Sequence, residues 1–145
     1  ALYPTELGTC FSGSAIETAD GELKLIYTAH RRIDDEDYQV QCLVHADRSL
    51  STYCHDERNP VLDNPGLPCF RDPKVIWHAP TKRWIMPLYV GEKDPVKKDA
   101  KGNPATRHVC HFYTSPDLKV WSFASKFAEE LFECPGFFEL HEHGF

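Results

Sequence analysis

Two carboxyl groups stand in settings that would push their pKa values in opposite directions. Asp72 follows Arg71 in the segment FRDP, residues 70–73, so a neighbouring cation should keep its carboxylate ionised. Glu133 stands alone in FECPGFFEL, residues 132–140, among phenylalanine and cysteine side chains, and desolvation there should raise its pKa. A protonated carboxylic acid working beside an ionised carboxylate is the requirement for hydrolysing a glycosidic bond. We therefore predict that the two groups converge on one sugar-sized hollow, although they lie far apart in the sequence.

A third segment, CFSGSA at residues 10–15, places small residues beside an aromatic side chain. We expect a backbone turn here that can approach a ligand closely, because glycine and serine leave room for it. Taken singly, each segment has a plain interpretation. Arg-Asp-Pro is most often a turn with a salt bridge, and a lone glutamate before Cys-Pro is most often an edge residue. The three segments in this order are more specific than any one of them.

The overall composition narrows the class of ligand. The 145 residues carry a formal net charge of −6 without a basic patch interleaved with aromatic residues, which argues against nucleic acid as a partner. No apolar run approaches the length that spans a membrane, and the first residues, ALYPTELGT, lack the pattern of a signal peptide. A hydrophobic content of 41% is typical of a globular domain. A small, neutral or weakly charged ligand therefore fits best.

Six cysteines are spread irregularly and include no C-x-x-C pair. A structural metal site would show tighter spacing, and the nearby His108 and Cys110 are too few to form one, so we predict no metal. Small buried thiols are the favoured interpretation, and disulfides are the alternative. Because disulfides need an oxidising compartment, the thiol interpretation favours an intracellular protein over a secreted one without fixing the compartment.

The elements that must position these residues are β-strands. Short runs rich in β-branched and aromatic residues alternate with turn residues, as expected of an all-β fold. The predicted strands are 23–28, 38–44, 51–54, 73–78, 83–90, 107–115 and 119–124. Helix patterns are nearly absent, and the one weak candidate is SKFAEELF at residues 125–132. The hydrophilic segment 91–107 is predicted to be a solvated loop.

The order of the strand runs repeats once along the chain. Three runs with a polar turn near Asp47 are followed by a similar set with a turn at residues 115–117. A repeat of strands joined by hairpins is typical of β-propeller blades. We expect residues 1–66 to form one blade, 67–125 the next, and 126–145 the start of a third. Two blades cannot close a ring, so we expect the chain to be part of a larger propeller.

Together the three segments resemble glycoside hydrolase family 32, which contains the invertases, exo-inulinases and levanases. The family motifs FSGSA, RDP and ECP match residues 11–15, 71–73 and 133–135 in the same order. The segments NPV at 59–61 and QVQ at 39–41 are also similar to family sequence, so the resemblance covers nearly the whole chain. It implies a five-bladed β-propeller, usually followed by a β-sandwich, of which this chain would supply two to three blades.

The resemblance also implies a reaction and the residues that perform it. The reaction is the retaining hydrolysis of a terminal β-fructofuranoside in sucrose, inulin or levan, without a cofactor. Glu133 would be the general acid/base, and Asp72 would stabilise the transition state through hydrogen bonds to fructose hydroxyls. Arg71 would orient Asp72 and keep its carboxylate ionised. The fructose subsite would be lined by Phe11 and Ser12.

Two departures from the family pattern limit what can be expected of the chain. Cys134 would support Glu133, but the position after ECP, often Asp in the family, is Gly136 here, as in some invertase-like and inulinase-like members. The family nucleophile is an Asp in an Asn-Asp-Pro-type motif upstream of FSGSA, and the ten residues before FSGSA in this sequence, ALYPTELGTC, contain no such motif. Asp34 and Asp35 lie in an acidic loop between strands and are interpreted as solvated charges.

We therefore expect the 145-residue chain to be inactive by itself, because it has an acid and no nucleophile. A companion segment or self-association could complete the propeller and restore activity. A non-catalytic module that binds fructose or fructan is the alternative from another functional class. Fructosyl transfer is the alternative within the enzyme class.

Overall fold

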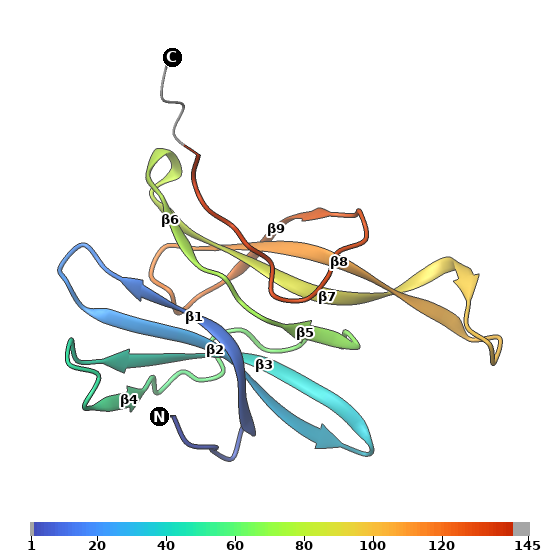
Figure 1. Ribbon diagram of the computed structural model, residues 1–145, viewed down its shortest axis with the longest axis horizontal. Helices are drawn as coiled ribbons and strands as arrows, with labels where there is room; N and C mark the ends of the chain where they lie inside the picture. Colours follow the sequence, from blue (N-terminus) through green and yellow to red (C-terminus); the bar gives the residue numbers. More distant parts are fainter. Residues whose placement is uncertain (1, 141–145) are drawn as a thin grey trace.

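The computed structural model describes residues 2–140, and the chain is built of antiparallel β-strands, as predicted (Figure 1). The first sheet has four strands in the order β1-β2-β3-β4. Its strands are β1 (Thr9–Glu17), β2 (Leu23–Ile33), β3 (Glu36–Ala46) and β4 (Tyr53–His55). Alternating apolar residues along 38–44 had predicted β3, and its pairing with β2 runs without a register shift.

The second sheet has five strands, in which β5, β7, β8 and β9 follow one another and β6 pairs separately with β7. Its strands are β5 (Cys69–Arg71), β6 (Ile76–His78), β7 (Arg83–Lys98), β8 (Pro104–Ser115) and β9 (Ser122–Phe127). One turn of 3-10 helix, Ala79–Thr81, joins β6 to β7. Within the described residues, no helix has the length and apolarity to cross a membrane.

The weak helix prediction for residues 125–132 is wrong. Residues up to Phe127 belong to β9, which pairs with β8, and the chain from 128 to 140 has no regular structure. A short exposed helix would have little stability of its own, whereas strand pairing to β8 satisfies the backbone of 122–127. The expected boundary between 125 and 126 therefore falls inside a strand. The last five residues of the predicted third blade, 141–145, lie outside the described residues.

The main core lies between the two sheets. It is formed by side chains from both, led by Ile26 and Leu43 of the first sheet and Phe70, Met86 and Leu88 of the second. A smaller cluster covers the other face of the first sheet and includes Tyr27, Ala29, Val40 and Cys42, with Leu2 and Leu7 packed against it. Successive residues of a strand point to opposite faces, so Val40 enters the outer cluster while both glutamines of QVQ face the second sheet. All six cysteines are free thiols.

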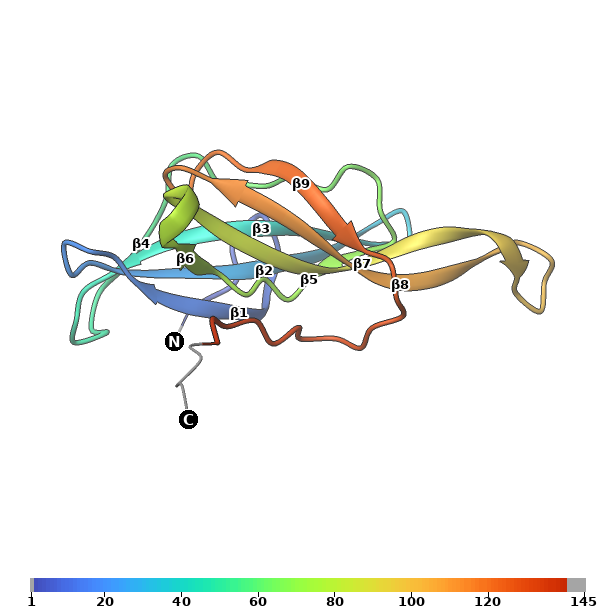
Figure 2. The same cartoon turned by 90° about the horizontal axis from the view of Figure 1, so that it is seen from above.

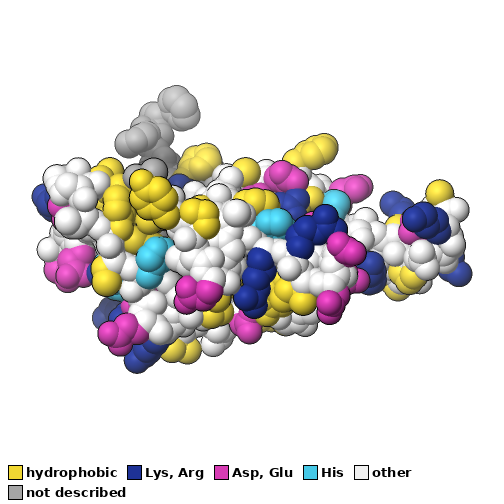
Figure 3. Space-filling view, turned by 90° about the horizontal axis from the view of Figure 1, so that it is seen from below, with side chains coloured by type: hydrophobic (Ala, Val, Ile, Leu, Met, Phe, Trp, Pro, Cys, Tyr) yellow, Lys and Arg dark blue, Asp and Glu magenta, His cyan; other side chains and the backbone are white. Residues whose placement is uncertain are grey.

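The hydrophilic segment 91–107 is a strand hairpin rather than the loop that was predicted. Strand β7 continues to Lys98, β8 begins at Pro104, and the turn between them is held by Asp99, whose carboxylate accepts from the backbone N–H groups of Lys101 and Asn103. The hairpin projects from the body of the molecule (Figures 1 and 2), and its tip carries the exposed lysines Lys97, Lys98 and Lys101 (Figure 3). Because both faces of this projection are solvated, its sequence lacks the apolar alternation that identifies a half-buried strand.

Glu92 organises a charged cluster at the base of this hairpin. Its carboxylate accepts hydrogen bonds from Arg107, His111 and Lys126 at 2.8–3.0 Å. Partial burial alone would raise the pKa of Glu92, but the hydrogen bonds from Lys126, His111 and Arg107 outweigh it and lower the pKa to about 2. The folded-state pKa thus lies below the ordinary value of a glutamate.

Glu92→Gln is therefore expected to reduce stability at neutral pH and to remove part of the acid sensitivity. A carboxylate with a lowered folded pKa stabilises the fold above its unfolded pKa, and this stabilisation is lost as pH falls from about 4.5 towards 2. Its contribution is on the order of 2 kcal/mol near pH 7. Urea unfolding of wild type, Glu92→Gln and the exposed control Glu129→Gln between pH 7 and 3 measures it. If the free energy of unfolding depends on pH identically in the two variants, the charged cluster at Glu92 contributes nothing to stability.

Candidate functional site

A cavity of about 790 Å³ lies at the end of the first sheet where β1 begins, β2 ends and β3 begins. The loop after β5 and the irregular segment after β9 complete its wall, since the chain turns back after β9 across the second sheet (Figures 1 and 2). Its lining residues are Cys10, Phe11, Ser12, His30, Asp37, Gln39, Arg71, Asp72, Glu133 and Cys134. All six residues proposed from the sequence as site residues are among them. The three sequence motifs thus meet at one cavity.

Asp72 is held in place through its backbone by the first sheet. It follows β5 directly, its side chain is only 5% exposed, and its φ of 61° lies in the left-handed region. Its N–H donates to the Thr28 hydroxyl at 3.0 Å, and that hydroxyl donates to the Gln41 amide oxygen at 2.8 Å. Non-glycine residues in this backbone region persist only where the surroundings hold them, and such residues gather at functional sites.

The two glutamines of QVQ extend this network to β5. The amide nitrogen of Gln41 donates to the carbonyl oxygen of Phe70 at 2.7 Å, and the Phe70 N–H donates to the side-chain oxygen of Gln39 at 2.8 Å. All of these groups are buried between the sheets, where an unpaired polar group is costly. The network therefore fixes the position of the residue that precedes Arg71 and Asp72.

Thr28→Val is expected to destabilise the protein by about 2–4 kcal/mol, because it leaves the Asp72 N–H and the Gln41 amide oxygen buried without a partner. Valine has nearly the same shape as threonine, so no cavity contributes to this loss. Thr28→Ser is the matched control, since it keeps the hydroxyl and loses one methyl group, which costs about 1 kcal/mol. Urea unfolding compares the two variants. Equal stability of Thr28→Val and Thr28→Ser would mean that the network does not hold the Asp72 loop.

Arg71 connects the two carboxylates of the site. Its guanidinium is 2.5 Å from Glu133 and 3.8 Å from Asp72, and it lies 4.8 Å above the ring of Tyr89 on the neighbouring strand. Burial alone would lower the pKa of Arg71, but the hydrogen bond to Glu133 raises it overall, so the group stays charged. Stacking on an aromatic face and a forked set of donors make arginine suited to holding a carboxylate in a fixed orientation.

The expected apolar surroundings of Glu133 are not found, and that prediction is wrong for the described residues. The Glu133 side chain is 60% exposed, and Phe132 and Phe138 are 94% and 71% exposed. In an irregular segment, side chains that are close in sequence need not enclose one another. Two long-range contacts position the segment instead. The Leu131 N–H donates to the His108 carbonyl at 3.1 Å, and the ring of Phe137 packs against Phe112 at 5.5 Å.

Cys134 and Ser12 bring the first and last motifs together. The backbone N–H of Cys134 donates to the Asp72 carboxylate at 3.2 Å, and its thiol lies 4.0 Å from the Ser12 hydroxyl. Like Asp72, Cys134 has a left-handed backbone, with φ of 55°. Its observed contacts are therefore with Asp72 and Ser12, whereas the sequence had suggested a supporting contact to Glu133.

The FSGSA motif lies on a strand and not in the turn that was expected. It belongs to β1, whose pairing with β2 shifts register between Cys10 and Gly13. This irregularity falls where Phe11 and Ser12 meet the cavity. A β-bulge re-aims side chains locally, which explains how consecutive residues of one strand can both line the same cavity.

Four lining residues were not proposed from the sequence: Cys10, His30, Asp37 and Gln39. Asp34 and Asp35 are exposed, as predicted, and both have positive φ in a two-residue turn between β2 and β3. That turn pairs β2 with β3 and so brings His30 close to Asp37, 2.9 Å between Nε2 and Oδ1. His30 pairs with Gln39, and Asp37 lies two residues before Gln39 on the same face, so His30 and Asp37 are diagonal neighbours across the two strands. The signal available in the sequence was the turn, which sets this pairing.

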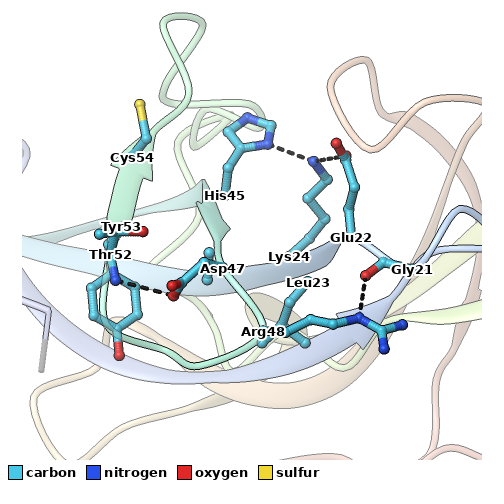
Figure 4. Close-up of a pocket in the computed structure, with 11 residues that line it drawn as sticks. Gly21, Glu22, Leu23, Lys24, His45, Asp47, Arg48, Thr52, Tyr53 and Cys54 are labelled. Carbon is cyan, nitrogen blue, oxygen red and sulfur yellow. Dashed lines mark hydrogen bonds and ion pairs between the residues drawn. The ribbon is translucent and has the colours of Figure 1, made fainter.

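A second cavity, of about 420 Å³, lies at the opposite end of the first sheet, where β2 begins and β3 ends (Figure 4). Its polar groups are paired with one another: Lys24 contacts Glu22 and His45, and Asp47 accepts from the Thr52 N–H. Among the described residues, no group of three potential metal ligands was found. This cavity shares no residue with the three motifs, and we assign it no function.

Proteins with similar sequences and structures include a levanase, an exo-inulinase and a β-fructofuranosidase. The levanase of Bacillus subtilis is 35% identical over 99% of this chain and 21% of its own length. The extracellular exo-inulinase of Aspergillus niger is 29% identical over 90% of this chain and 27% of its own length. A variant of the Bombyx mori β-fructofuranosidase, solved in complex with sucrose, superposes with a TM-score of 0.71 at 27% identity and covers 94% of this chain and 28% of that one.

The chain corresponds to only part of the length of each of these relatives. It spans about a quarter of the length of the curated relatives it matches. Within that span, the family model described as the N-terminal domain of glycosyl hydrolases family 32 matches residues 1–144. The cavity geometry, the order of the motifs and this match agree: the chain belongs to glycosyl hydrolases family 32, as part of the N-terminal domain.

Proposed function

We propose that this chain is part of the catalytic domain of a β-fructofuranosidase that releases terminal fructose from sucrose or a fructan. The observation that carries the proposal is the single cavity in which Arg71, Asp72 and Glu133 meet. A cavity lined by charged and hydroxyl groups, with one aromatic wall at Phe11, suits an uncharged sugar. The activities of the relatives support the substrate class.

In the proposed reaction, Glu133 acts first as an acid and then as a base. It donates a proton to the glycosidic oxygen as the bond to the fructosyl carbon breaks, and a nucleophilic carboxylate forms a covalent bond to that carbon. Water then attacks the same carbon, Glu133 accepts its proton, and the nucleophile is released. Asp72 accepts hydrogen bonds from fructose hydroxyls and stabilises the positive charge that develops on the ring.

The ion pair between Arg71 and Glu133 constrains how the cycle begins. A carboxylate held by a guanidinium is not available to donate a proton, so the acid step requires that the bound sugar separates the two side chains. Glu133 can move for this step because its side chain is largely exposed and its segment is irregular. Arg71 is mostly buried and would keep its contact with Asp72.

The same proposal includes the architecture. The two sheets are neighbouring blades of a five-bladed propeller: the first sheet, within residues 1–66, forms one blade, and the second sheet, from Cys69 to the end of β9 at Phe127, forms the next. The segment after β9 would lead into a third blade. Each sheet contains four antiparallel strands in sequence order, with β6 as an addition to the second. The shared core between the sheets supports this arrangement, since adjacent blades of a propeller pack face to face.

The 145 residues alone are proposed to be catalytically inactive. The carboxylates that line the cavity in the described part of the chain are Asp37, Asp72 and Glu133. Asp72 and Glu133 have roles in the mechanism, and Asp37 is hydrogen-bonded to His30. The nucleophile would therefore come from a companion segment, either elsewhere in a longer polypeptide or in another copy.

Fructose release tests both parts of the proposal. The native protein, meaning the polypeptide as the cell makes it, and the 145-residue chain are each incubated with sucrose, inulin and levan. We expect the native protein to release fructose from at least one of them and the 145-residue chain to release none. A native protein inactive on all three would refute the proposed activity. Turnover by the 145-residue chain, abolished by Glu133→Gln, would refute the need for a companion segment.

A non-catalytic fructose-binding module is the second candidate, favoured by the lack of an unassigned carboxylate facing Glu133 among the described lining residues. Calorimetry of the native protein with fructose separates the candidates, because a module binds fructose and releases none from any substrate. Fructosyl transfer is tested in the same assays by looking for products longer than the substrate.

A further inference from the structure

The β2–β3 hairpin adds two side chains to the cavity that the three motifs do not contain. His30 lies near the end of β2, and Asp37 lies near the start of β3, on the two sides of the turn at Asp34 and Asp35. Both line the cavity together with Arg71, Asp72 and Glu133. Neither has a part in the proposed bond cleavage.

The two side chains hold each other in a fixed arrangement. The Nε2 atom of His30 lies 2.9 Å from Oδ1 of Asp37, and the imidazole ring stacks on Phe11 with 4.4 Å between centroids and 15° between planes. Phe11 thereby fixes the plane of the ring, and Asp37 fixes its rotation. Such preorganisation lowers the entropy that a binding site loses when a ligand is bound.

Each member of the pair keeps one polar atom for a ligand. Neither Nδ1 of His30 nor Oδ2 of Asp37 forms a hydrogen bond with any residue in 2–140. The Asp37 side chain is 56% exposed and that of His30 is 18% exposed, so both can be reached from the cavity. A carboxylate oxygen next to an imidazole nitrogen offers two contact points to neighbouring sugar hydroxyls.

The charge of the cavity indicates which sugars it would accept. The hydrogen bond from His30 lowers the pKa of Asp37, so this carboxylate is ionised at neutral pH. Three acidic side chains, Asp37, Asp72 and Glu133, then face one permanent cation, Arg71. An incoming phosphate group would meet net negative charge and lose its hydration, whereas an uncharged sugar would not.

We propose that His30 and Asp37 form a hydroxyl-binding pair that contributes to substrate affinity and favours uncharged fructosides over phosphorylated ones. This inference rests on the proposed function, because it assigns the pair to the same sugar-binding cavity. The pair is a specificity determinant and takes no part in proton transfer.

Asp37→Asn tests the pair, and Asp35→Asn is the matched control. Both variants remove one exposed carboxylate from the same hairpin, but only Asp37 lines the cavity. We expect Asp37→Asn to raise the KM for the best uncharged substrate about tenfold with little change in kcat, since a hydrogen bond to a charged group is lost in ground state and transition state alike. The ratio of kcat/KM for sucrose to that for sucrose 6-phosphate should fall as well. Asp35→Asn should have the same KM as the wild type and the same ratio of kcat/KM values for the two sugars.

The outcomes separate this inference from the proposed function. If the protein is active and Asp37→Asn and Asp35→Asn have the same KM and the same selectivity, the role assigned to His30 and Asp37 is wrong, and the proposed function stands. If the native protein binds sucrose by calorimetry without cleaving it, the same two variants are compared by their dissociation constants, and equal constants overturn the pair. A native protein that neither binds nor cleaves any of these sugars would overturn both. Thermal unfolding of each variant checks that the fold is intact.

Discussion

Glu133→Gln is expected to lower fructose release by the native protein by about 10²–10⁴-fold, the usual contribution of a positioned general acid/base. Glutamine has nearly the same shape, and its amide oxygen can still accept a hydrogen bond from Arg71, so the cavity should keep its form. It cannot donate a proton to the leaving oxygen or remove one from water. The loss should therefore appear in kcat, with a KM close to that of the wild type.

Two comparisons make this result specific to the chemistry. Glu130→Gln removes the same charge from the same irregular segment, three residues away and outside the cavity lining, and should leave kcat unchanged. A fructoside with a more acidic leaving group needs less help from an acid, so Glu133→Gln should slow its cleavage by a smaller factor. If Glu133→Gln and Glu130→Gln were equally active, the acid would have to be another residue.

Gly13→Ala is expected to destabilise the protein by about 3 kcal/mol or more, which is the upper range for overpacking. A Cβ at this position would lie 2.1 Å from the carbonyl oxygen of Ile26 and 2.7 Å from the Cα of Tyr27. Both atoms belong to the backbone of β2, so no side-chain rotation can relieve the clash. The first two strands would have to separate at the place where the FSGSA motif meets the cavity.

Gly136→Ala provides the control, because among residues 2–140, its two chain neighbours aside, no heavy atom lies within 4 Å of the Cβ it would add. The midpoints of urea unfolding should therefore fall for Gly13→Ala and stay close to the wild type for Gly136→Ala. A Gly13→Ala protein as stable as Gly136→Ala would mean that β1 does not pack as described. Because Gly13 is not among the residues that line the cavity of about 790 Å³, any loss of activity should follow the loss of folded protein.

The strand pattern could be predicted wherever one face of a strand is buried and the other is not. The run 38–44 alternates for this reason and was found in β3. The strand β1 was missed because serine and glycine in FSGSA imitate a turn, and its apolar positions are few. The outer part of the β7–β8 hairpin was missed because solvent covers both faces, so the sequence carries no alternation there.

The convergence of the motifs could be predicted from their resemblance to the family, whereas the local surroundings of each side chain could not. Glu133 was expected to be enclosed by its sequence neighbours, but an irregular segment has no fixed period that places them. His30 and Asp37 were missed because their proximity depends on the pairing of β2 with β3. A sequence pattern identifies which residues are chemically able to act, and strand pairing decides which of them meet.

The most direct measurement is a crystal structure of the native protein carrying Glu133→Gln with sucrose bound, since the slow variant should preserve the substrate. We expect the fructose unit in the cavity between Ser12 and Arg71, with its hydroxyls bound to Asp72. The amide at position 133 should lie within about 3 Å of the glycosidic oxygen, the distance of a hydrogen bond. Sucrose bound at another surface, with no contact to Asp72 or to position 133, would contradict the assignment of this cavity as a fructosidase active site.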